Sequence, residues 1–400
     1  MHTAARLQPF GTTIFAEMTA LANAHGAVNL AQGFPDYDGP QVAIKAAVSA
    51  ASSAKNQYAR SFGVPELLCA IASRWNAERV ASSTHAAHVA DPDSSITVTS
   101  GCTEALAACV LGLLNPGDEI ILFEPYYDSY AACVAMAGAT AKYVALRPSM
   151  PGGPFMFNEA DLRAAISPRT RAILVNTPHN PTGKVFTREE LSSIAKLCIE
   201  HDIIAITDEV YEDLVYNPEL PHISLATLEG MWDRTITLSS LGKSFALTGW
   251  KIGWAIATPS LTRAVRSAHQ FLTFASATPL QYGAAAAITE GLDFLAPQRA
   301  MLIRNRDALA SALTRLGMIV HPSDGTYFIM ADHTPLSAKL GLADDVQLCR
   351  HLTQHVGVAA IPPSAFYANK ALGRPFVRFA YCKQEATIAL AIQRLATVCR

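Results

Sequence analysis

The sequence lacks a disulfide pattern and a basic excess, and each absence argues against a class of protein. Its eight cysteines are scattered with no Cys-x-x-Cys pair, which disfavours both a disulfide framework and a cysteine-built zinc site. Lysine and arginine number 31 against 33 acidic residues, a formal net charge of −2. Nucleic-acid binding depends on basic residues that neutralise phosphates, so this balance argues against a nucleic-acid partner.

Long apolar runs are also missing. No run reaches the roughly 18 residues of a membrane-spanning helix, and the first residues show no charged-then-apolar signal pattern. With unpaired cysteines, this predicts a cytoplasmic protein without a membrane partner. What the chain does have is size: 400 residues, 50% hydrophobic and 16% charged. That composition is typical of a globular chain about two to three domains long.

Strand-like and helix-like segments alternate between about residues 94 and 256. This alternation predicts an α/β fold with a doubly wound, mostly parallel sheet. Residues 203–207 (IIAIT) are almost wholly apolar, as expected for a strand covered by helices on both faces.

The last third of the chain has a different pattern, typical of a smaller α+β domain. A long helical run precedes three expected strands, at residues 325–331, 357–362 and 376–381. The predicted domains are residues 1–45 (an N-terminal arm and part of the small domain), 46–285 (the large domain) and 286–400 (the small domain).

One lysine, Lys243, stands between two apolar segments. Residues 235–238 predict a buried strand, and a small polar loop then leads to the lysine. Burying an ammonium is costly unless it is paired or loses its charge. A desolvated lysine with a lowered pKa is the usual amine nucleophile for Schiff-base chemistry. A solvated loop lysine is the alternative, because most lysines are exposed.

Three further positions carry local signals. Gly101, Cys102 and Thr103 form a turn that opens a helix, where free N–H groups favour an anion. Asp208 ends the apolar strand, where open α/β sheets bind ligands, although it could instead cap a following helix. Arg378 lies within an apolar strand, suited either to capture a ligand carboxylate or to pair with a protein acid.

The segment SSLGKSFALTGWK, residues 239–251, resembles the lysine segment of the class I/II, fold-type I aminotransferases, which depend on pyridoxal 5′-phosphate (PLP). Further family motifs follow in order along nearly the whole chain: NLAQGFPD, NQYA, NTPHNPTG and DEVYE. They look most like the kynurenine, glutamine and methionine aminotransferase branch, with the methionine subgroup closest. The resemblance implies the PLP transferase fold and a homodimer.

The resemblance also implies a role for each matching residue. Lys243 would form the Schiff base, Asp208 would pair with the pyridine nitrogen, and Tyr211 would donate to the phenolic oxygen. The other implied cofactor contacts are Gly101, Cys102, Thr103, Ser240 and Lys251 at the phosphate, Tyr126 on the ring, Asn180 at the phenolic oxygen, and Tyr58 reaching into the partner subunit. The implied substrate-carboxylate contacts are Gly33, Asn176, Asn180 and Arg378. No metal is implied.

The implied activity is ping-pong transfer of an amino group from an amino acid to a 2-oxo acid. Residues 270–278 contain neither arginine nor lysine. In the family this region lies near the substrate side chain, so a neutral donor of methionine, aromatic or kynurenine type is implied. Tyr58's implied role requires composite active sites in a dimer.

Two alternative functions remain at this point. The first is a β-lyase acting on cysteine S-conjugates or cystathionine with the same residues. The second is a non-enzymatic regulator built on an aminotransferase-like domain. Such regulators carry an added DNA-binding module, for which this chain has neither spare N-terminal length nor basic charge.

Overall fold

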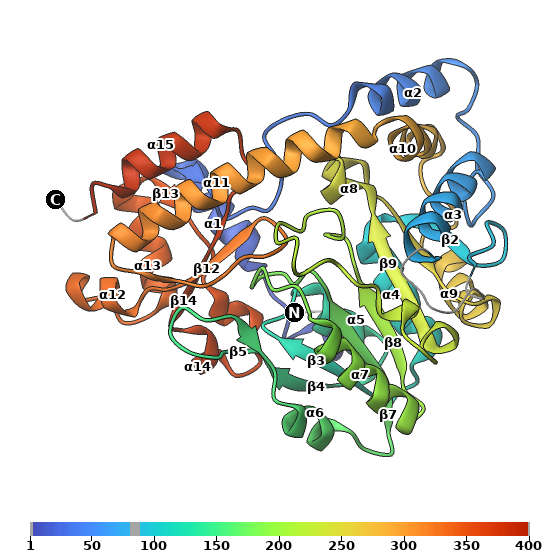
Figure 1. Cartoon of the computed structure of the whole chain (residues 1–400), viewed down its shortest axis with the longest axis horizontal. Coiled ribbons are helices and arrows are strands. Elements are labelled where there is room, and N and C mark those ends of the chain that lie inside the picture. Colours follow the sequence, from blue (N-terminus) through green and yellow to red (C-terminus); the bar gives the residue numbers. More distant parts are fainter. Residues whose placement is uncertain (1–2, 81–88, 399–400) are drawn as a thin grey trace.

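The computed structural model describes residues 3–80 and 89–398, and a seven-stranded sheet forms its centre (Figure 1). The strand order is β2-β10-β9-β8-β7-β3-β4, and β10 alone runs antiparallel to its neighbours in this sheet. The strands are β2 (Ile96–Ser100), β3 (Glu119–Glu124), β4 (Thr140–Ala145), β7 (Thr170–Asn176), β8 (Ile204–Asp208), β9 (Thr235–Ser240) and β10 (Ile252–Ile256). The predicted mostly parallel α/β sheet is confirmed.

Helices cover both faces of this sheet because successive side chains of a strand point to opposite faces. In β3, Ile120 and Leu122 pack into one apolar layer, while Ile121 and Phe123 pack into the other. The first layer holds α4 (Gly101–Leu113), α5 (Ser129–Met136) and α9 (Pro259–Leu272). The second holds α6 (Glu159–Ala165) and α7 (Arg188–Glu200). A capping box formed by Thr187 and Glu190 fixes the start of α7.

A third apolar layer covers the β2–β10 end of the sheet. It contains α3 (Pro65–Val80), α2 (Gln41–Ser52) and α10 (Thr278–Glu290). A Cβ at Gly283 would lie 2.8 Å from the Ala43 carbonyl oxygen, so α2 and α10 pack closely. The predicted domain boundaries at 45 and 285 fall inside α2 and α10, and the division into domains stays a prediction.

The small domain combines the N-terminal segment with the end of the chain. Figure 1 shows the long helix α11 (Leu295–Arg315) running from beside α10 into this domain. Its antiparallel sheet has the order β11-β12-β14, with β11 (Ile319–Val320), β12 (Phe328–Asp332) and β14 (Phe376–Ala380). Helices α1 (Ile14–Ala24), α13 (Asp345–His351) and α15 (Glu385–Leu395) share its core.

The strand expected at residues 357–362 differs from the prediction. Only the two-residue strand β13 (Val358–Ala359) forms, and it pairs in parallel with β1 (Val28–Asn29). Beyond it, Ile361 makes a single antiparallel bridge to Arg378 of β14. Gly357 has a positive φ of 77° and Pro362 follows, so the segment can sustain only a short strand.

The remaining elements are short. They are β5 (Arg147–Pro148), β6 (Phe155–Met156), α8 (Leu241–Ser244), α12 (Thr334–Leu340), α14 (Lys370–Gly373), the 3₁₀ turns Ala5–Leu7, Leu225–Thr227, Trp232–Arg234, Thr248–Trp250, Leu292–Phe294 and Pro363–Phe366, and the π-helical turn Leu352–Val356.

The seven cysteines of the described residues carry free thiols, and Cys399 lies outside those residues. No helix in the described ranges combines the length and apolarity needed to cross a bilayer.

Candidate active site

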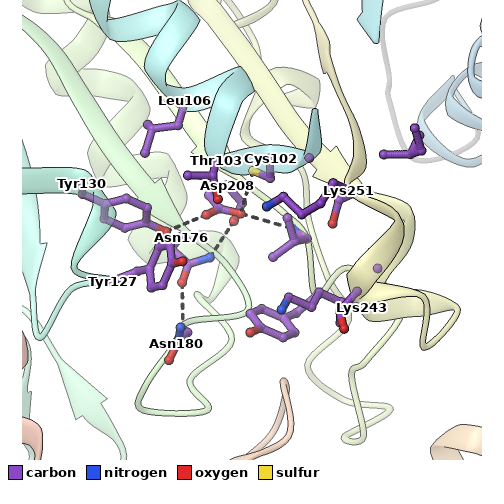
Figure 2. Close-up of a pocket in the computed structure, with 17 residues that line it drawn as sticks. Cys102, Thr103, Leu106, Tyr127, Tyr130, Asn176, Asn180, Asp208, Lys243 and Lys251 are labelled. Atoms are coloured by element: carbon purple, nitrogen blue, oxygen red, sulfur yellow. Dashed lines mark hydrogen bonds between the residues drawn. The ribbon is translucent and has the colours of Figure 1, made fainter. Parts of the chain in front are cut away.

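A pocket lies where β2, β7, β8 and β9 end and their connecting segments begin (Figure 2). Ten residues predicted as site residues line it: Gly101, Cys102, Thr103, Asn176, Asn180, Asp208, Tyr211, Ser240, Lys243 and Lys251. They come from segments far apart in sequence, and the sheet brings them together because parallel strands end at one edge.

Lys243 lies in α8, the single helical turn that follows β9. Gly242 allows this turn to pack tightly, because a Cβ there would lie 2.9 Å from Thr248 Cα. The Lys243 ammonium faces the pocket, 5.9 Å from the centre of the Tyr211 ring. Burial lowers the pKa of Lys243 below its ordinary value of 10.5, as the nearby Lys251 also does. Lys243 is partly buried and lies in a helical turn that lines the pocket, which differs from a solvated loop lysine, and a lowered pKa favours a neutral amine.

Asp208, the last residue of β8, holds its carboxylate in the pocket wall. Oδ2 accepts a hydrogen bond from the Tyr130 hydroxyl at 2.6 Å. Oδ1 lies 3.4 Å from the Val210 nitrogen and 3.6 Å from the Cys102 sulfur. Burial raises the pKa of Asp208, and its hydrogen bonds and Lys243 oppose that rise. No helix follows directly in the chain, where turns lead to Leu214, so the helix-cap alternative is also wrong.

A chain of amide hydrogen bonds joins Asp208 to Arg378. The Asn176 side chain donates to the Asp208 carbonyl at 2.8 Å and accepts from the Asn180 backbone N–H at 2.7 Å. The Asn180 side-chain oxygen in turn accepts from Arg378 Nη1 at 3.0 Å. Asn176 was predicted to contact the substrate carboxylate. In the structure its amide braces Asp208 and Asn180, and because its second side-chain N–H is not used by these two bonds, its predicted contact with the substrate carboxylate stays a prediction.

Arg378 lies in β14 and is 1% exposed. Its Nη2 donates to the Ala31 carbonyl at 2.8 Å, while its Nε is buried without a partner. The rings of Phe15, Phe328 and Phe366 lie 5.3, 4.1 and 5.3 Å from Cζ.

The electrostatics of Arg378 favour a ligand. Burial lowers its pKa to about 10. Within the described ranges no carboxylate lies at ion-pair distance from it, which excludes the predicted alternative of a structural salt bridge. A buried guanidinium is costly without an anion, so a ligand carboxylate would complete this site.

The turn between β2 and α4 forms the anion end of the pocket. Gly101 has a φ of +73°, and a Cβ there would lie 3.1 Å from the Lys251 ammonium nitrogen. No side chain caps the start of α4, so its first N–H groups remain available. The N–H groups, the ammonium and the Ser240 hydroxyl suit a phosphate, and with Lys243 and Asp208 they fit PLP.

The ring-stacking prediction for Tyr126 is wrong in position. Tyr126 does not line the pocket; its ring stacks on that of Tyr143, with centroids 5.4 Å apart at 23°. The next residue, Tyr127, lines the pocket instead, with its ring edge-on to Tyr130. In an extended segment, neighbouring side chains point in opposite directions. An error of one residue in the sequence-based prediction therefore assigned the wrong tyrosine to the pocket. Tyr127 lies two residues before α5 and Tyr130 lies in its first turn, and both line the pocket.

Gly33 and Tyr58 lie outside the pocket lining. Gly33 is packed against Phe328, where a Cβ would come within 2.6 Å of the ring, and its carbonyl accepts from the Tyr327 hydroxyl. Tyr58 is 86% exposed and packs edge-on against Phe274 at 5.4 Å. Its implied role concerns a second subunit and stays a prediction.

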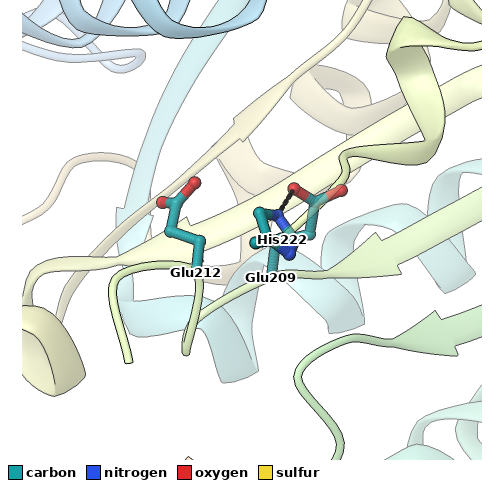
Figure 3. A group of neighbouring side chains, drawn as sticks. All are labelled: Glu209, Glu212 and His222. Atoms are coloured by element: carbon teal, nitrogen blue, oxygen red, sulfur yellow. Dashed lines mark hydrogen bonds and ion pairs between the residues drawn. The ribbon is translucent and has the colours of Figure 1, made fainter. Parts of the chain in front are cut away.

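A separate polar group lies beyond the pocket and consists of Glu209, Glu212 and His222 (Figure 3). Each could offer one metal-ligand atom within 4.8 Å of the others. Protein groups already hold these atoms: His222 Nε2 lies 2.8 Å from Glu209, the Ser224 hydroxyl donates to Glu209, and the Ser239 hydroxyl donates to Glu212. We interpret the group as a partly buried hydrogen-bond network that supports the loop after β8.

Comparisons with known proteins identify the family of this chain. The family model described as aminotransferase class I and II matches residues 26–395. The probable N-succinyldiaminopimelate aminotransferase DapC of Mycobacterium tuberculosis is 44% identical, over 99% of this chain and 98% of that protein. The methionine aminotransferase of Escherichia coli is 37% identical, over 98% of this chain and 97% of that protein.

A solved structure gives the same result for the fold. The N-succinyldiaminopimelate aminotransferase from Mycobacterium tuberculosis superposes with a TM-score of 0.93 at 44% identity, covering 99% of this chain and all of that one. The relative named for N-succinyldiaminopimelate thus shares more identity with this chain than the one named for methionine. Similarity to the methionine subgroup therefore does not by itself select the substrate.

Proposed function

Since this chain belongs to the class I and II aminotransferases, a PLP-dependent family of enzymes, we propose that its amino donor is an amino acid with a neutral side chain. Methionine, aromatic and kynurenine-like amino acids fit this description. The observation that carries the proposal is the set of cations at the pocket. Among the described residues that line it, the cations are Lys243 and Lys251, and Arg378 adjoins them through Asn180.

Each of these cations has a task that leaves none for a second substrate carboxylate. Lys251 faces the phosphate turn, and Lys243 is the amine that reacts with the cofactor. Arg378 then serves the α-carboxylate common to all amino acids. The absence of arginine and lysine from residues 270–278 supports the same choice.

The mechanism follows from the placement of these groups. When bound, PLP supplies an aldehyde for the donor amine and a ring that accepts the electrons left at Cα. Arg378 and Asn180 hold the donor carboxylate and so fix the direction of its Cα–H bond. Lys243 Nζ, as a neutral amine, would take the proton from the donor Cα and deliver it to the aldehyde carbon of the cofactor. Asp208 would present a negative charge to the ring nitrogen, and the Tyr211 hydroxyl would donate at the phenolic oxygen. Phe15, Phe328 and Phe366 keep water from the guanidinium.

A second candidate donor is N-succinyldiaminopimelate. The 44% identity over 99% of the chain to an aminotransferase named for that compound favours it. Such a donor is long and carries further carboxylates, so it would need cations beyond those of the pocket lining. Those cations would have to come from the pocket entrance or from a second subunit.

A donor panel separates these possibilities. The PLP-loaded protein would receive methionine, phenylalanine, kynurenine, N-succinyldiaminopimelate or aspartate without an acceptor, and the rate of spectral change would be recorded. Methionine or an aromatic donor should react at least about tenfold faster than aspartate, a difference of about 1.4 kcal/mol. Faster reaction with N-succinyldiaminopimelate than with every neutral donor would reverse the proposal. Release of pyruvate and ammonia from cystathionine without an acceptor would instead indicate the β-lyase alternative.

We also infer that the enzyme acts as a homodimer. An exposed apolar patch consists of Tyr58, Phe271, Leu272 and Phe274, which are 86, 86, 46 and 48% exposed. Large exposed apolar patches mark interaction surfaces, and Tyr58 is the residue whose implied role lies in a partner's active site.

The dimer is tested by placing a charge in this patch. Phe271→Asp should convert a dimer into monomers in sedimentation velocity and lower activity together with it, because burying an unpaired carboxylate is costly. Leu390→Asp, at a residue 42% exposed on α15, is the matched control and should remain dimeric. A wild-type protein that sediments as a fully active monomer would contradict the inference.

A further inference from the structure

The carboxylate of Asp208 is approached from both sides by side chains of two different helices (Figure 2). Tyr130, in the first turn of α5, donates to Oδ2 at 2.6 Å. Cys102, in the first turn of α4, has its sulfur 3.6 Å from Oδ1. We propose that Tyr130 is a positioning residue that aims Asp208 at the ring nitrogen of PLP, with the Cys102 thiol as a second and weaker donor.

Tyr130 is suited to this task because it is a fixed and permanently neutral donor. It is 3% exposed, and its ring packs edge-on against Tyr127 with centroids 5.7 Å apart at 82°. Burial, with the charge of Asp208, raises the pKa of the phenol well above 10. The hydroxyl therefore keeps its single hydrogen, which is directed to Asp208 in a short charge-assisted bond.

The two oxygens of Asp208 are not equivalent as a result. Oδ2 is engaged by the short bond from Tyr130. Oδ1 has only long contacts, 3.4 Å to the Val210 nitrogen and 3.6 Å to the Cys102 sulfur. A carboxylate oxygen can accept two hydrogen bonds, so Oδ2, which accepts one, and Oδ1, whose two contacts are long, leave the carboxylate able to accept a further hydrogen bond. Tyr130 thus fixes the orientation of the carboxylate, whose remaining acceptor capacity would serve the ring nitrogen.

Tyr130 also acts on the charge of Asp208. A carboxyl must be ionised to stabilise a protonated ring nitrogen. Burial raises the pKa of Asp208, and the hydrogen bond from Tyr130 is the largest influence against that rise. Losing the donor would allow the carboxyl to hold a proton more readily and weaken its pairing with the ring.

Cys102 contributes less, and through its side chain. The resemblance implied only a phosphate contact for this residue. Burial raises the pKa of its thiol well above 9, so the sulfur stays protonated and can donate a weak hydrogen bond to Oδ1. A thiol here adds a donor that alanine would not have.

The test measures binding of two cofactors to the full-length protein, and it rests on the PLP-dependent function and on the predicted pairing of Asp208. The first cofactor is PLP, and the second is its 1-deaza analogue, in which C–H replaces the ring nitrogen. Tyr130→Phe should raise the Kd for PLP about tenfold, the factor for one hydrogen bond to a charged group. It should leave the Kd for the deaza analogue within about twofold, because that ring makes no hydrogen bond to Asp208. Cys102→Ala should show the same selectivity with a smaller loss, about twofold to threefold.

The controls separate positioning from general support of the pocket. Tyr143→Phe, at a tyrosine outside the pocket lining, should bind both cofactors as the wild type does. Equal weakening of both cofactors by Tyr130→Phe, or no weakening of either, would overturn the proposal. Failure of the wild type to bind PLP would instead remove the premise, so the two failures are distinguishable.

Discussion

Lys243→Ala is expected to lower the rate of amino transfer by at least about 10⁴-fold, the upper range for a positioned acid–base group. The variant loses the amine that reacts with the cofactor and the base that moves the Cα proton. The measurement is a single-turnover reaction of the PLP-loaded protein with methionine, followed by absorption. Lys196→Ala, at an exposed lysine of α7, should keep the wild-type rate. A Lys243→Ala protein within about tenfold of wild type would refute the assignment.

The Lys243→Ala variant should keep its fold. The lowered pKa of Lys243 also predicts how the stability of the wild type and of the variant should differ with pH. Burial lowers the pKa of Lys243 below 10.5, so between the folded and unfolded pKa values the unfolded chain binds more protons. Wild-type stability therefore rises with pH through that window, and at pH 7 the lysine carries a folding cost. The PLP-free variant should melt at or above the wild-type temperature at pH 7, with the difference shrinking toward pH 10.5. A much lower melting temperature of the variant would mean that its lost activity results from a damaged fold.

The large sheet was predictable from sequence because its signals are local. The apolar run that forms β8 and its polar ending at Asp208 need no long-range information. The pairing of β13 with β1 joins Val358 to Val28 across most of the chain. No local pattern encodes such a contact, so the small domain was predicted less accurately.

The candidate active site likewise has some features that the sequence predicts and others that it does not. The placement of Lys243, Asp208 and Arg378 was predictable, since Asp208 ends an apolar strand, Arg378 lies within one, and Lys243 follows one in the next helical turn. Tyr126 was predicted at the cofactor ring, whereas Tyr127 lines the pocket. This error of one residue arose in the segment that follows β3. The hydrogen bond from Tyr130 to Asp208 depends on how α5 packs over the end of β8, which sequence spacing does not report.

Arg378→Lys is expected to raise the KM for the amino donor about 100-fold, the equivalent of about 2.7 kcal/mol. Arginine offers a rigid fork for two parallel hydrogen bonds to a carboxylate, whereas lysine offers a point charge. The guanidinium is also held by Ala31 and Asn180, and a shorter, single-headed ammonium cannot keep both contacts while facing a ligand. Because lysine keeps the positive charge, a loss of donor binding would show that the shape of the guanidinium is needed as well as its charge. Steady-state kinetics across a range of donor concentrations give the value.

A matched substrate shows whether the loss arises at the carboxylate. The amine that corresponds to methionine without its carboxylate cannot use Arg378, so wild type should prefer methionine strongly, and Arg378→Lys should lose about the same 100-fold of that preference. The Kd for PLP should be unchanged, since Arg378 is predicted to bind the substrate and not the cofactor. Arg374→Lys, at an exposed arginine just before β14, should change neither quantity. If Arg378→Lys weakened the binding of methionine and of the amine equally, the arginine would be supporting the pocket as a whole. Carboxylate capture would then not explain why this cation is buried beside three phenylalanine rings.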